Sequence, residues 1–512
     1  MFSLIQTRRG TVANIARGVV ILAMVKWLSP PSAIAQSPTA GNHSEVPQPL
    51  VVETPWQFHG NGTNQNADAI MPWSDRTSAI AHDTNNQDVT DSEGETWSYL
   101  SDGEFQPLHC RTCDLQEQRW GFNRRPFQLG GWIQQGVTLN PDSPRNHSNA
   151  PVLFNDRSND YQLNQFYVYA GKQVQVDGTG WDWGARVDLN YGTDSRFVTV
   201  PGLEKHNDRT RKWNSETSKF GLAMPQAYLD IATPLGPYGS TFRAGHFYAL
   251  GGYETFAAPD NFFYSHSYTY VYGEPFTHSG GMWHAKLTPT LSVAVAATTG
   301  WDSFYNELDG WGTRFGIVKE LNEGQTTIAL TAHTGDDFTG ITTSQGTSYD
   351  SRTWASIVLK HYLNTKLYYV FQGDYGRQEQ AVIKLDNSNN TIAFDAGQWW
   401  GLNQYLVYQI SHQWASGMRV EWFRDDGNSR VGVPIEYVNS GPAFLGSDYY
   451  AITGGVNYKP HPNVLFRNEI RWDGSDVQSN ASVPGGIAGI RPFDDRSDQD
   501  QLTIAMDLIV LF

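Results

Sequence analysis

The residues from Trp181 to Tyr191 alternate between apolar and polar side chains at every position. Successive side chains of a β-strand point to opposite faces, so this segment predicts a strand with one apolar and one polar face. About 9–11 tilted residues cross the hydrocarbon layer of a membrane, and aromatic residues at both ends suit its two interfaces. A half-buried strand of a soluble sandwich has the same alternation. The rest of the chain has to decide between the two.

The first residues have the composition of an export signal. Arg8 and Arg9 lie ahead of an apolar run from Gly18 to Val25, and Ala33–Ala35 offers a small-residue cleavage site. We predict a signal peptide over residues 1–35, because the apolar run is too short for a transmembrane helix. The net charge of -16 argues against nucleic acid as a partner, since binding it requires a basic surface.

Residues 36–127 form an N-terminal region without a sustained hydrophobic period. The region is rich in Asn, Asp, Ser, Gly, Pro and Gln, so we predict irregular structure that serves as a plug or as a periplasmic segment. Its Cys110 and Cys113 are the two cysteines of the chain, and export favours a disulfide between them. A redox motif, a c-type haem and a zinc site each lack a required feature nearby. We therefore predict no cofactor and no metal.

The strand pattern recurs from Leu129 to the end of the chain. We predict about sixteen strands, an even number in the porin range, at Leu129–Leu139, Leu163–Gly171, Gly180–Tyr191, Gln226–Ala232, Thr241–Tyr248, Gly281–Leu287, Leu291–Thr299, Gly312–Lys319, Gln325–His333, Ser351–His361, Lys366–Tyr375, Gln398–Ser411, Gly417–Asp425, Asp448–Tyr458, Asn463–Asp473 and Leu502–Phe512.

Short and long connections alternate between these strands. The long ones are polar and cover residues 192–225, 249–280, 300–311, 334–350, 376–397, 426–447 and 474–501. A soluble sandwich has no reason for this alternation, whereas a transmembrane barrel has short periplasmic turns and long outer loops. The sequence therefore predicts an all-β fold over residues 128–512, a transmembrane antiparallel up-and-down β-barrel in contact with outer-membrane lipids.

The predicted lipid-facing rows are apolar with a few exceptions. The last strand has an unbroken apolar row that ends at Phe512. Gln404 and Asn468 fall on lipid-facing rows, where a polar amide is costly. Either these strands carry a bulge there, or the two sites contact a neighbouring subunit of a homo-oligomer.

Several short stretches carry a resemblance to one bacterial family. They are Gly130–Val137, Phe154–Arg157, Tyr161–Gln165, Asn261–Tyr268, Gly273–Gly280 and Arg419–Asp426. These stretches resemble the bacterial putative beta-barrel porin family of the second type, over about Gly130 to Phe512. The resemblance implies an outer-membrane barrel with porin function and supplies no catalytic residues. The terminal Phe512 also resembles the signal that the barrel-assembly machinery reads.

The inward rows of the predicted barrel carry charges of both signs. We predict as pore-lining residues Asp182, Arg186, Asp188, Arg243, Arg314, Arg419, Glu421, Arg467, Glu469, Arg471 and Asp473. Opposed charges in a watery lumen can tune selectivity, or they can pair and solvate the wall. Their balance gives no ion preference.

Two outer loops have unusual compositions. The loop Asn261–Gly280 holds seven aromatic residues, which predicts either a loop that folds inward and narrows the pore or additional interfacial aromatics. The acidic segment Asp494–Asp500 has oxygen ligands for a divalent cation but no recognised calcium-loop spacing, so we predict a solvated loop.

These features together predict an outer-membrane porin for passive diffusion of small hydrophilic solutes. Inward rows rich in charged residues, Asn and Gly indicate a wet lumen rather than a packed one. A barrel with a closed lumen that acts as an anchor or adhesin is the main alternative. A secreted carbohydrate-active enzyme is a further one, but no carboxylate pair has a diagnostic spacing and no nucleophile or zinc motif is present.

Overall fold

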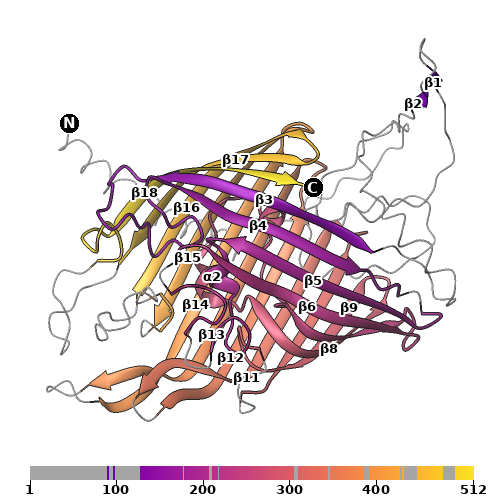
Figure 1. Cartoon of the computed structure of the whole chain (residues 1–512), viewed down its shortest axis with the longest axis horizontal. Helices are drawn as coiled ribbons and strands as arrows, with labels where there is room; N and C mark the ends of the chain where they lie inside the picture. Colours follow the sequence, from indigo (N-terminus) through magenta and orange to yellow (C-terminus); the bar gives the residue numbers. More distant parts are fainter. Residues whose placement is uncertain are drawn as a thin grey trace, which may run out of the picture.

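A closed β-barrel accounts for most of the residues that the computed structural model describes (Figure 1). The structure describes residues 89–90, 96–97, 127–176, 178–206, 210–216, 218–304, 310–343, 346–385, 391–426, 429–431, 447–476 and 491–512. The predicted signal peptide and the two cysteines lie outside these residues. So does nearly all of the predicted irregular N-terminal region, of which β1 (Val89–Thr90) and β2 (Thr96–Trp97) form a two-stranded sheet.

Sixteen antiparallel strands form the barrel wall, as the sequence predicts. They are β3 (Gln128–Leu139), β4 (Asp160–Lys172), β5 (Asp182–Gly192), β6 (Gly221–Thr233), β7 (Ser240–Tyr248), β8 (Thr277–Thr288), β9 (Leu291–Thr298), β10 (Gly312–Leu321), β11 (Thr326–Thr343), β12 (Gly346–Tyr362), β13 (Leu367–Leu385), β14 (Thr391–Gln409), β15 (Trp414–Asp426), β16 (Ser447–His461), β17 (Val464–Ser475) and β18 (Asp500–Leu511).

Each strand pairs with its neighbours in sequence, and β18 closes the barrel on β3. The closing register runs from Ile504 opposite Leu139 to Leu511 opposite Trp132. Phe512 extends it, because its backbone N–H and C=O exchange hydrogen bonds of 2.9 Å with Gly131. Closure leaves no unpaired strand edge. A barrel in a membrane requires such closure, because lipid cannot bond to exposed backbone groups.

The apolar row predicted for β5 faces outward. Val187, Leu189 and Tyr191 are 46%, 40% and 45% exposed, whereas Asp188 and Asn190 between them are buried. The same alternation continues on β18, where Leu502, Ile504 and Met506 are exposed. A band of exposed apolar side chains around a closed wall is suited to lipid. Among the described residues, no helix is long and apolar enough to cross a membrane.

Two of the predicted long loops are instead extensions of strands. β11 and β12 continue their pairing as far as Thr343 and Gly346, and β13 and β14 pair as far as Leu385 and Thr391. These hairpins project beyond the rim of the barrel in Figure 1. The prediction of irregular loops at residues 334–350 and 376–397 is therefore wrong. Antiparallel pairing satisfies the backbone polar groups even where no membrane surrounds the strands.

The barrel interior is packed along β8 to β14, so the lumen is not wet on every side as the sequence predicts. Inward-facing Val318, Val370 and Val407 form a buried cluster with Leu250 and Tyr253 from the connection between β7 and β8. The cluster includes further apolar residues on the inward rows of β8 to β14. The prediction from the sequence rests only on the charged inward residues and does not include this cluster. A segment of chain inside the wide barrel covers these apolar residues, so their burial is favourable.

The two amides on lipid-facing rows lie in unbroken strands. The β14–β15 register runs continuously past Gln404, and the β16–β17 register runs continuously past Asn468. A bulge therefore explains neither site. Gln404 accepts a hydrogen bond of 3.0 Å from the Tyr369 hydroxyl, which partly compensates the amide, and a subunit contact at Asn468 stays a prediction.

Candidate functional site

Residues 249–276, which connect β7 to β8, cross the interior of the barrel. We call them the constriction segment. It includes the short helices η2 (Ala258–Asp260) and η3 (Thr269–Gly273). In the ring, β7 and β15 have seven strands between them in either direction, so they lie on opposite sides. The segment leaves β7 and bonds to β15 and β17, which confirms the prediction that this aromatic loop folds inward.

Arg467 on β17 holds the first part of the constriction segment. Its Nη1 donates to the backbone carbonyls of Ala258, Asn261 and Phe263 at 2.8–2.9 Å. The rest of the guanidinium forms a two-point ion pair with Asp507 on β18. Nη1 carries two N–H groups, so two of the three carbonyls share one of them, and the bonds reach carbonyls that no strand pairs.

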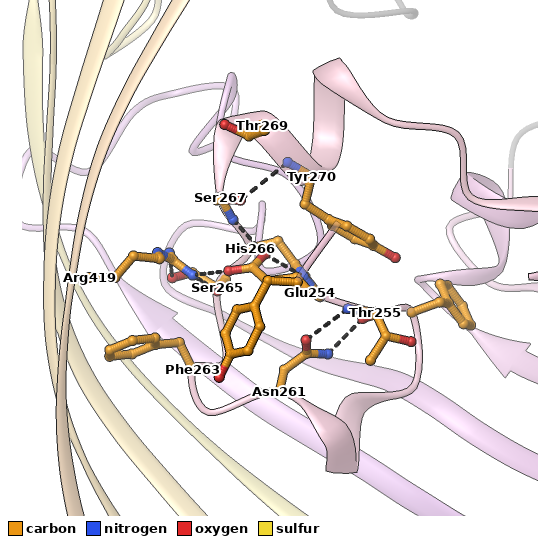
Figure 2. A network of polar contacts seen from close by, with 12 residues as sticks. Glu254, Thr255, Asn261, Phe263, Ser265, His266, Ser267, Thr269, Tyr270 and Arg419 are labelled. Carbon is orange, nitrogen blue, oxygen red and sulfur yellow. Dashed lines mark hydrogen bonds and ion pairs between the residues drawn. The ribbon is translucent and has the colours of Figure 1, made fainter. Parts of the chain in front are cut away.

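Arg419 on β15 holds the middle of the segment through Glu254 (Figure 2). Its Nη1 donates to Glu254 Oε1 and to the Ser265 carbonyl, both at 2.7 Å. Glu254 Oε2 also accepts from the Ser267 backbone N–H at 2.8 Å and contacts His266 Nδ1 at 3.2 Å. Burial alone would raise the pKa of Glu254. The neighbouring Arg419 and His266 outweigh burial and lower the pKa to about 2. The carboxylate is therefore ionised at any physiological pH.

Carboxylates of the same wall accept hydrogen bonds from the segment. Glu469 accepts from the backbone N–H of Tyr264 at 2.9 Å, and Glu421 accepts from that of Tyr268 at 2.9 Å. Asp473 accepts from the Tyr268 hydroxyl at 2.9 Å. Donors and acceptors from β15 and β17 thus alternate along the segment. Such charge-assisted bonds are short and directional, so they fix its position.

Strands on other sides of the barrel also bind the constriction segment. Gln165 on β4 donates to the Phe256 carbonyl at 2.8 Å, and Trp399 on β14 donates to the Gly273 carbonyl at 3.1 Å. Gln372 on β13 accepts from the Tyr253 backbone N–H at 3.0 Å. The segment is therefore attached to several parts of the wall.

The structure separates the residues predicted to line the pore into two groups. Arg186 and Arg243 keep 22% of their side-chain surface exposed, and Asp182 is also partly exposed as a residue. The others face the interior and are buried: Asp188, Arg314, Arg419, Glu421, Arg467, Glu469, Arg471 and Asp473. Six of these eight, on β15 and β17, lie beneath the constriction segment. Asp188 bonds to wall residues, and Arg314 to His278 and to the Gly300 carbonyl at 3.1 and 3.0 Å.

Glu254 and His266 were not identified from the sequence. Both belong to the segment itself, where an isolated carboxylate and histidine carry no pattern. The sequence offered one indirect signal for this site, which was the aromatic residues nearby together with the charged inward rows predicted for β15 and β17. A loop that enters the lumen needs partners for its backbone, and those rows can supply them.

No group of residues that could hold a metal ion occurs in the part of the chain that the structure describes. In the acidic segment, the Asp495 carboxylate accepts from the backbone N–H groups of Arg145 and Asn146, at 2.6 and 3.0 Å. This carboxylate therefore joins two outer loops.

A closed sixteen-stranded barrel with an apolar outer band and a loop fixed across its interior defines an outer-membrane β-barrel of the porin class. A family model described as "Putative beta-barrel porin-2, OmpL-like" matches residues 126–512. The chain belongs to this family, as the resemblance implies, and its location is the outer membrane.

Solved structures that align with most of the chain share little sequence with it. The outer-membrane channel DcaP of Acinetobacter baumannii has a TM-score of 0.47 at 10% identity, over 76% of this chain and 97% of that one. OprB of Pseudomonas putida has a TM-score of 0.44 at 12% identity, over 75% of this chain and 94% of that one. OmpF of Salmonella typhi, in a complex with daunomycin, has a TM-score of 0.44 at 12% identity, over 76% of this chain and 98% of that one. A comparison with curated proteins finds no significant match.

Proposed function

We propose that this porin lets small hydrophilic solutes diffuse passively and that the constriction segment sets the size limit. The observation that carries the proposal is the attachment of residues 249–276 to the far wall, at Arg419 and Arg467, inside a closed barrel. A sixteen-stranded wall is wide enough for an aqueous channel unless its interior is filled. A loop fixed part-way along the interior narrows such a channel and keeps its width constant.

The purified full-length protein in a planar lipid bilayer tests this function. We expect stepwise conductance of a constant size. If the full-length protein stays closed and a version without residues 36–126 conducts, the N-terminal region is a plug. If neither version conducts, diffusion is refuted and the anchor or adhesin function replaces it.

We propose no enzymatic activity for the barrel. The buried carboxylates of its interior, among them Glu254, Glu421 and Glu469, accept hydrogen bonds from the constriction segment or from arginines. A general acid or base needs access to a substrate. Their bonds instead support a structural role.

We propose that the barrel-assembly machinery recognises the C-terminal strand, with Phe512 as its signal. Phe512 is 55% exposed, and its ring stacks near Phe166 on the outer surface at 6.3 Å between centroids. Deletion of Phe512 is expected to lower the amount of folded barrel, whereas Phe512→Tyr keeps an aromatic ring and should assemble normally. Heat-modifiable migration of membrane fractions measures both. Equal folded amounts of the deletion and the unaltered protein would contradict the role.

A further inference from the structure

Water reaches the inward-facing side chains of β5 to β8 more than those of β15 and β17. Arg186, Tyr228, Arg243 and His284 are partly exposed, although each lies on the inward row of its strand. Their outward neighbours Val187, Leu229, Phe242 and Trp283 are exposed to the outside. The inward charged residues of β15 and β17 are buried under the constriction segment. Water in the lumen therefore contacts this stretch of β5 to β8, whereas Asp188 and His246 further along the same strands are buried.

Two arginines and a tyrosine form one continuous strip on this wall. Arg186 lies opposite Tyr228 in the β5–β6 register, and Arg243 on β7 stacks over the same Tyr228 ring at 3.7 Å. Arg186 stacks over the Tyr169 ring of β4 at 4.6 Å. An aromatic face attracts a guanidinium and restricts its motion, so both charges have fixed positions along the strip.

The carboxylates that pair with these arginines are less accessible than the arginines. Asp188 accepts from Arg186 Nε at 2.7 Å and from Gln226 at 2.8 Å, and its side chain is fully buried. Asp230 accepts two bonds from Arg243, at 2.8 and 2.9 Å, and its side chain is 9% exposed. A solute in the lumen therefore meets guanidinium N–H donors ahead of carboxylate oxygens.

We infer that Arg186 and Arg243 make this wall a path for small anions, with small organic carboxylates as the solute class. The inference rests on the proposed diffusion function and specifies its selectivity. A guanidinium presents a planar set of donors that matches a carboxylate. Fixed cationic side chains in a pore raise the local concentration of anions and disfavour cations. The tyrosine rings beside them offer apolar contact to the carbon skeleton of an organic anion.

Reversal potentials in a planar bilayer under a potassium chloride gradient test the selectivity. We expect the unaltered protein to prefer chloride, and Arg186→Gln with Arg243→Gln to lower the chloride-to-potassium permeability ratio several-fold. Arg186→Lys with Arg243→Lys keeps both charges and should retain most of the preference. Lys219→Gln is the matched control, because it removes one positive charge from an outer loop where the side chain is 52% exposed.

Acetate in place of chloride then probes the carboxylate class, and we expect it to permeate the unaltered protein and to be impeded in the double Gln variant. If the double variant does not fold, Arg186→Gln alone should lower the ratio part of the way. A conducting protein that prefers potassium, or whose ratio is the same in the arginine variants and in the unaltered protein, overturns the inference and leaves diffusion intact. Absence of any conductance refutes diffusion and the inference with it.

Discussion

Replacing residues 256–272 with a short Gly-Ser linker is expected to increase the single-channel conductance several-fold. This replacement removes the backbone carbonyls to which Arg419, Arg467 and Arg471 donate, among them that of His266, which accepts from Arg471 at 2.8 Å; Glu254 stays in place. The bulky side chains that cross the interior, such as Phe263 and Tyr264, leave with it. Water then reaches the charged inward rows of β15 and β17, which become pore-lining residues. Single-channel recording in a planar bilayer measures the change.

The control for this deletion is an outer loop that is mostly exposed. Replacement of residues 210–216 by a Gly-Ser stretch of equal length should leave the conductance unchanged, because these residues lie largely at the surface. The deletion variant must also show heat-modifiable migration, which reports an intact barrel. An intact deletion variant with unaltered conductance would show that the segment does not limit the pore.

Val187→Arg is expected to destabilise the barrel by roughly 2–4 kcal/mol, since it places a charge on the lipid face near the bilayer midplane. Val187 lies in the middle of β5 and is 46% exposed on the outer surface. Unfolding by denaturant in lipid vesicles measures the loss. Arg186→Lys, one residue away on the partly exposed inward row, keeps the cation beside Asp188 and should fold nearly normally. Equal destabilisation by the two changes would contradict the assignment of faces on this strand.

The structure changes the expected effect of a charge reversal at Asp188. Its position on the inward row predicts that Asp188→Arg is tolerated because the side chain faces water. The structure instead buries Asp188 between Arg186, Gln226 and the Tyr167 hydroxyl. Asp188→Arg places a second cation next to Arg186 and removes a shared acceptor. We expect a cost of about 3–5 kcal/mol, which is typical of a broken buried ion pair.

The alternation of apolar and polar residues is enough to predict the barrel, its strands and its two faces. Strand alternation is a local property, because neighbouring side chains point to opposite sides whatever the distant chain does. The segment from Trp181 to Tyr191 therefore identifies the lipid face of β5, and the repeated pattern locates all sixteen strands. Bounds were less certain where strands extend beyond the membrane, as in β11 and β13, since no lipid imposes alternation there.

Contacts between distant parts of the chain set which inward residues meet water. Glu254 and Arg419 are 165 residues apart in sequence, and Ala258 and Arg467 are 209 apart. No local pattern links such pairs, because their contact depends on closure of the barrel and on the path of the constriction segment across it. An inward-facing charge looks the same in sequence whether it lines a channel or holds a loop. Burial by a distant segment places Arg419 and Arg467 beneath the loop and leaves Arg186 and Arg243 partly exposed.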